Sequence, residues 1–194
     1  FPEAEKRLKQ MKRWMGYFSK TIYKTGVGEF NSSIYAPYNI IGWLNVYDFA
    51  KDKEVKKMAR AVLDYYAVEM ALHYSQAMTG GSDLRGKGNV ESFQGAAAFM
   101  GWLWFGDSPQ PFDMEIFMQE DQANNEVIQS VHAATSEYRV PEIAVKLAQN
   151  KLKLPAYYRN SKPGYLLEKP SSIKQSFYRT QDYNLGAGYF PYGG

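Results

Sequence analysis

The segment from Pro37 to Met70, PYNIIGWLNVYDFAKDKEVKKMARAVLDYYAVEM, carries the clearest helical pattern in the chain. Its first half places apolar residues at helical spacing, and Pro37 is a favourable first residue of a helix. A turn at Lys51 and Asp52 precedes a second helix, for which Asp52 is a good N-cap. Because so short a turn permits only an antiparallel return, the stretch predicts a helical hairpin.

The same spacing argument extends to both sides of this hairpin. Helices are expected at 3–24, 37–50, 53–78, 91–105, 120–135 and 141–151. After Leu154 the pattern changes to short strand-like runs broken by proline and glycine. The predicted fold class is therefore mainly α, with a helical domain at 1–154 and a β-rich segment at 155–194 that begins a second domain.

The composition is that of a globular chain and excludes several function classes. The 194 residues are 45% hydrophobic and 22% charged, and the net charge of +3 is too small to indicate a nucleic-acid partner. No apolar run reaches the length of a membrane helix. The chain has no cysteine, and its two histidines lack metal-site spacing, so neither a metal nor a cofactor is expected. The 16% aromatic content suits a sugar-binding groove, although a well-packed helical core also accounts for it.

The antiparallel hairpin places two polar, glycine-rich loops, at 25–36 and 80–89, on the same face of the helical layer. Polar loops at one end of a rigid scaffold are a favourable place for a binding site. The candidate catalytic residues are Glu29, Tyr35, Asp83 and Arg85, and the candidate substrate-binding residues are Asn31, Tyr38, Trp43 and Lys87.

The loop at 26–32, GVGEFNS, and the phrase at 45–52, NVYDFAKD, resemble the bacterial (α/α)-toroid carbohydrate-active proteins. This is the group around the heparinase II/III-like and alginate-lyase-like polysaccharide lyases. The loop at 80–86, GGSDLRG, and the segment at 178–185, YRTQDYNL, resemble the later glycine-rich loop and the entry into the following β-rich domain.

The resemblance spans about residues 10–105 and 155–190 and implies an arc of an (α/α)-toroid. It further implies a secreted or periplasmic protein that acts on an extracellular polysaccharide or oligosaccharide. It also implies that these residues contact the remainder of a larger chain. In Asn124-Asn125-Glu126 the nearby histidine common in these lyases is missing. This departure favours a second interpretation, a non-catalytic glycan-binding or scaffold domain.

Two reactions suit the candidate residues. A lyase acting on a uronate needs a group that neutralises the carboxylate, and Asn31 or Arg85 is suited to this role. It also needs a base and an acid, and Tyr35 or Tyr38 is suited to either role. A glycosidase instead needs two facing carboxylates about 5–10 Å apart. The hairpin topology brings together one such pair, Glu29 and Asp83.

Each candidate also has a structural explanation. Glu29 can support the start of the helix that follows it, since a carboxylate near a helix N-terminus is favourable. Asp83 can pair with Arg85 across a turn. Trp43 and the tyrosines can belong to the core and its edges. Glu69 and His73, one helical turn apart, are expected to form a hydrogen-bonded pair within a buried helix.

Overall fold

The computed structural model describes residues 2–75, 78–83, 96–106, 130–163 and 173–190. In this part of the chain it is mostly helical, with a small antiparallel sheet near the C-terminus, which confirms the coarse fold class. The helices are α1 (Pro2–Thr25), α2 (Tyr35–Phe49), α3 (Lys53–His73), α5 (Ala96–Phe105) and α8 (Glu142–Ala148). The strands are β1 (Tyr74–Ser75), β2 (Met78–Thr79), β3 (Ala156–Lys162), β4 (Ile173–Arg179) and β5 (Asn184–Tyr189).

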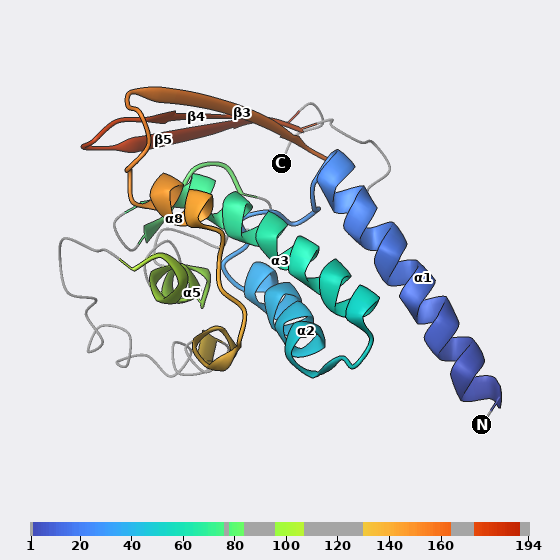
Figure 1. Cartoon of the computed structure of the whole chain (residues 1–194). Helices are drawn as coiled ribbons and strands as arrows, with labels where there is room; N and C mark the ends of the chain where they lie inside the picture. Colours follow the sequence, from blue (N-terminus) through green and yellow to red (C-terminus); the bar gives the residue numbers. More distant parts are fainter. Residues whose placement is uncertain (1, 76–77, 84–95, 107–129, 164–172, 191–194) are drawn as a thin grey trace.

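The helical layer is built around α3, which packs against α1, α2 and α8 (Figure 1). Asp52 caps α3 as predicted, because its carboxylate accepts the backbone N–H groups of Glu54 at 2.8 Å and Val55 at 3.2 Å. The middle of α3 contributes Val62, Leu63, Tyr66 and Ala67 to the core, whereas Val68 on its other side is exposed. No helix among the described residues is both long and apolar enough to cross a membrane.

The predicted end of α3 was wrong. The helix was expected to continue to Met78 but ends at His73, and Tyr74 already has an extended backbone. Tyr74 and Ser75 then pair antiparallel with Met78 and Thr79, so that each strand of this hairpin has two residues. The glycines at 80 and 81 therefore follow a hairpin and not a helix.

Arg179 explains why α3 stops where it does. This buried side chain of β4 donates to the carbonyls of Ala71 at 2.6 Å, Tyr74 at 2.9 Å and Ala148 at 3.3 Å. It therefore satisfies carbonyls at the ends of both α3 and α8, where a cation is also favourable for the helix dipole. Burial lowers the pKa of Arg179 to about 10, which leaves the guanidinium charged at neutral pH.

The three-stranded sheet has the order β3-β4-β5, with both pairings antiparallel. It lies across the helical layer, above α8 and the C-terminal end of α3 in Figure 1. Asn184 of β5 adds a second link between the two layers, since its amide donates to the Leu72 carbonyl at 3.2 Å. One face of the sheet is thus covered by helices, and the other faces outward.

Candidate functional site

The first loop and the described part of the second are in contact. The Asn31 amide donates to the carbonyl of Gly80 at 3.3 Å, across 49 residues of sequence. On its other side, the first loop is held by α5, because the backbone N–H of Ala97 donates to the Ser33 carbonyl at 3.1 Å. The described part of the second loop, residues 80–83, therefore lies beside the first loop as predicted, and residues 84–89 lie outside the described residues.

The backbone of the first loop is unusual at three positions. Glu29 and Asn31 have positive φ angles, 42° and 50°, a region that residues other than glycine rarely adopt. Gly26 has φ +83°, and a Cβ there would lie 3.0 Å from Cδ of Lys162 and 3.2 Å from the Tyr65 hydroxyl. Only glycine fits this turn without strain, because both the backbone angle and the close packing exclude a side chain.

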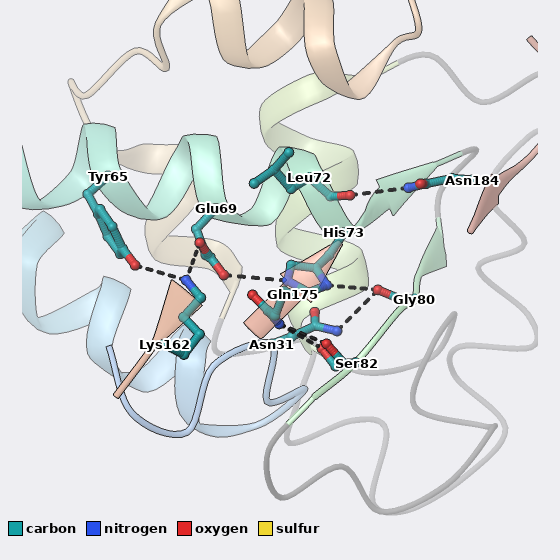
Figure 2. A network of polar contacts seen from close by, with 10 residues as sticks. All are labelled: Asn31, Tyr65, Glu69, Leu72, His73, Gly80, Ser82, Lys162, Gln175 and Asn184. Atoms are coloured by element: carbon teal, nitrogen blue, oxygen red, sulfur yellow. Dashed lines mark hydrogen bonds and ion pairs between the residues drawn. The ribbon is translucent and has the colours of Figure 1, made fainter. Parts of the chain in front are cut away.

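A buried polar cluster lies beneath the two loops (Figure 2). We call Tyr65, Glu69, His73 and Lys162 the Glu69 cluster. Lys162, at the end of β3, is only 1% exposed, and its ammonium forms an ion pair with Glu69 and donates to the Tyr65 hydroxyl at 3.0 Å. The cluster joins the sheet to α3, because its lysine comes from β3 and its other members from α3.

The charges within the Glu69 cluster stabilise one another. Burial by itself would raise the pKa of Glu69, but the Lys162 ammonium and His73 lower it to about 2. The carboxylate is therefore ionised at neutral pH although it is buried. Burial and the Glu69 charge raise the pKa of Tyr65, so its phenol stays protonated.

His73 has two different neighbours at its ring nitrogens. Nδ1 lies 2.8 Å from the Gly80 carbonyl oxygen, and because a carbonyl only accepts, this contact assigns a proton to Nδ1. Nε2 faces Oε1 of Glu69 at 3.4 Å, longer than an ordinary hydrogen bond, and neither atom has another hydrogen-bond partner among the described residues. The ring also packs edge-on against Phe177 at 4.8 Å between centroids. His73 is thus held by the second loop, α3 and the sheet.

A small cavity separates the loops from the Glu69 cluster, and we call it the loop cavity. Its lining includes Glu29 and Asn31 from the first loop, Glu69 and His73 from α3, and Thr79 from β2. The space open to a water-sized sphere is about 20 Å³, enough for one water molecule. The loop cavity can therefore hold one small polar group, such as a water or the end of a larger ligand.

Two of the predicted site residues line the loop cavity, namely Glu29 and Asn31. Asp83 follows the β1–β2 hairpin as an exposed residue and is not part of the lining. Arg85 and Lys87 lie outside the described residues.

The three other predicted residues belong to α2. Tyr35 begins the helix and is half-buried, and its backbone N–H donates to the Ser32 hydroxyl at 3.1 Å. Tyr38 is exposed. Trp43 lies in the core, 7% exposed, and stacks on Phe18 at 5.5 Å between ring centroids. In this position Trp43 fills the core-packing role that the sequence also allowed.

Sequence reasoning anticipated that Glu69 and His73 face each other, but their 3.4 Å separation is longer than the hydrogen bond expected. It also missed Lys162 and Tyr65. A signal was present in α3, since a carboxylate on a helix that is apolar nearly all round needs a cationic partner. Nothing local identifies that partner, because Lys162 is 97 residues from Tyr65 in sequence.

No family model, no curated protein and no solved structure matches the chain. The described residues contain no group of three or more histidine, aspartate or glutamate side chains arranged to hold a metal ion.

Proposed function

We propose that the chain belongs to a secreted or periplasmic carbohydrate-active protein that cleaves an acidic polysaccharide as a lyase. The reaction is placed at the mouth of the loop cavity. The observation that carries the proposal is that Glu29 and Asn31 line the same cavity as the buried His73. We further propose that the antiparallel α2–α3 hairpin, with α1 beside it, is an arc of an (α/α)-toroid, and that other segments of a larger chain complete the ring.

A lyase cleaves a uronate by β-elimination. A base removes the proton α to the carboxylate, the bond from the β carbon to the glycosidic oxygen breaks, and a carbon–carbon double bond forms. The leaving oxygen then takes up a proton from an acid. In this proposal the Asn31 amide binds the substrate carboxylate, and Tyr35, which begins α2 directly after the loop, is the base. Glu29 accepts hydrogen bonds from sugar hydroxyls.

The described residues support elimination more than hydrolysis. A glycosidase requires two carboxylates on opposite sides of the scissile bond. Glu29 lines the loop cavity but Asp83 does not, and the second carboxylate of the lining, Glu69, is engaged with Lys162. The two-carboxylate arrangement expected for Glu29 and Asp83 therefore lacks its second carboxylate in the lining. Of the amide-and-tyrosine arrangement, Asn31 is in the lining, and Tyr35, which is not, begins α2 four residues further along.

The proposal is tested by Tyr35→Phe with Tyr17→Phe as the matched control. Tyr17 is an exposed tyrosine on α1, so its hydroxyl has no part in the proposed site. Uronate-containing polysaccharides are screened for unsaturated products by absorbance and, separately, for reducing-sugar release. Loss of a general base lowers the rate by about 10²–10⁴-fold, so Tyr35→Phe should abolish the absorbance signal while both variants keep the wild-type melting temperature. Reducing-sugar release without unsaturated product would show hydrolysis and contradict the lyase proposal.

A specific observation favours a second candidate, a non-catalytic glycan-binding domain. The loop cavity has room for about one water molecule, and two of the ionisable residues that line it, Glu69 and His73, are held within the Glu69 cluster. Glycan binding by the wild type with no product in either assay would establish this second function in place of the lyase.

A further inference from the structure

The outward face of the three-stranded sheet carries a broad groove that the loop cavity does not include. Its volume is about 460 Å³, and we call it the outer groove. Its side walls are formed by two exposed tyrosines, Tyr157 on β3, 54% exposed, and Tyr189 on β5, 66% exposed. Amphipathic rings in this position can pack against the apolar face of a sugar and also offer a hydroxyl.

The strand register explains why this face is hollow in the middle. Ser176 on β4 pairs with Ala187 on β5 and with Arg159 on β3, so the central row has two small residues and one long one. The neighbouring row pairs Lys174 with Tyr189. Because alternate residues of a strand point to the same face, these side chains all belong to the outer groove.

The outer groove is positively charged. Arg159 and Lys174 both contribute to it, and among the described residues no acidic side chain forms an ion pair with either. The Arg159 guanidinium lies 5.0 Å from the ring centroid of Tyr157, which keeps the cation beside the aromatic wall. The two cations occupy diagonal positions on adjacent strands, and residues placed in this way in an antiparallel pair lie about 7–8 Å from each other. The charge of this face is therefore complementary to an anionic chain.

One end of the outer groove lies next to the first loop. Phe190, directly after Tyr189, stacks on Phe30 of the loop at 6.3 Å between centroids. On the opposite edge, Gly26 packs so closely against Ser161 of β3 that a Cβ would lie 3.3 Å from the Ser161 carbonyl. Phe30 is only 1% exposed, so these contacts lie in the interior and anchor the first loop at the ends of β3 and β5 that border the outer groove.

We infer that the outer groove is a second binding site for an acidic polysaccharide, in which anionic sugar groups pair with Arg159 and Lys174 and a sugar ring packs against Tyr189. The inference rests on the proposed function for the class of ligand and adds a second contact region for a long chain. A nucleic acid fits less well, because two cations provide few phosphate contacts.

The test compares oligosaccharides of two and ten sugars from alginate, hyaluronan and heparin, by isothermal titration calorimetry. The variant Arg159→Gln/Lys174→Gln removes both groove cations. The control Lys51→Gln/Lys53→Gln removes the same charge from exposed positions at the α2–α3 turn. Since each exposed ion pair contributes up to about 1 kcal/mol, the groove variant should weaken binding of the ten-sugar probe by about tenfold. Binding of the two-sugar probe should stay within about twofold of wild type, because the proposed loop-cavity mouth is intact.

Equal affinity of the groove variant and the lysine control for the ten-sugar probes would overturn the inference and leave the proposed function standing. A loss in the groove variant, combined with wild-type affinity in Asn31→Asp, would support the groove and overturn the proposed loop-cavity site. If wild type binds none of the three acidic probes, or binds a single-stranded oligothymidylate as tightly, the assignment of the groove to an acidic glycan is overturned.

Discussion

Replacing Lys162 by methionine removes the cation that compensates the buried Glu69 carboxylate. Glu69 is 7% exposed and its pKa is about 2, against an ordinary value of 4.5. A difference of that size corresponds to about 3 kcal/mol of folding free energy, and breaking a buried ion pair from one side destabilises by about 3–5 kcal/mol. Both estimates place the loss of unfolding free energy in Lys162→Met near the upper end of the range for single substitutions.

For a chain of this length, 3–5 kcal/mol corresponds to a melting temperature lower by about 6–20 °C. The matched control is Lys146→Met, because Lys146 pairs with Glu142 at 2.7 Å on the surface of α8, with both side chains largely exposed. That variant should lose about 1 kcal/mol or less. Urea and thermal unfolding followed by circular dichroism measure both losses. Similar losses in the two variants would mean that Lys162 does not compensate the buried Glu69 carboxylate.

The double variant Glu69→Met/Lys162→Met tests the pairing directly. It replaces both charges by apolar side chains, and removal of a complete buried pair is often close to neutral. Its loss should be smaller than the sum of the two single losses by at least about 2 kcal/mol. Additive losses would mean that Glu69 and Lys162 do not stabilise each other.

Three other predictions concern pH, the helix ends and the core. A carboxyl whose pKa is lowered by folding contributes stability above its unfolded pKa. The stability advantage of wild type over Glu69→Gln should therefore be complete above about pH 5 and disappear as the pH falls toward 2. An advantage of wild type that grows on acidification would contradict this. Arg179→Met leaves buried carbonyls at the ends of α3 and α8 without their donor and should lose about 3–5 kcal/mol in urea unfolding, with little rescue by lysine. Gly101→Ala places a Cβ 2.8 Å from the Tyr74 ring and should lower the free energy of unfolding by about 1–3 kcal/mol. Gly42→Ala on α2, where a Cβ has nothing within 4 Å, should raise it by up to about 1 kcal/mol. The opposite order of melting temperatures would count against the packing described for α5.

The sequence contained enough local information to predict the hairpin and the meeting of the loops. Pro37 and Asp52 indicated the starts of two helices, and the short turn between α2 and α3 fixed their antiparallel direction, which brings Asn31 to Gly80. These features depend on capping and periodicity, which act over a few residues.

The end of α3 and the composition of the Glu69 cluster could not be predicted in the same way. The helix stops at His73 beside carbonyls bonded by Arg179, which is 108 residues from Ala71 in sequence. The partner of Glu69 is likewise supplied by a distant strand. Such contacts depend on how the sheet docks on the helices, and no local pattern encodes that docking.

The side chain of Trp43 illustrates a further limit of sequence reasoning. A tryptophan at a helical position is compatible both with a sugar-binding surface and with a core, and its environment decides between them. The stacking of Trp43 on Phe18 places it in the core between α1 and α2.

We propose that an acidic glycan binds where the first loop meets the β1–β2 hairpin. The most direct measurement is the affinity of wild type, Asn31→Asp and the control Asn45→Asp for the tightest-binding acidic oligosaccharide. Both variants add one negative charge, but Asn31 lines the loop cavity while Asn45 lies exposed on α2. Replacing a donor that faces an anion by a carboxylate should weaken binding by about tenfold or more, with Asn45→Asp close to wild type. Equal affinities of the two variants would contradict the placement of the glycan at these loops.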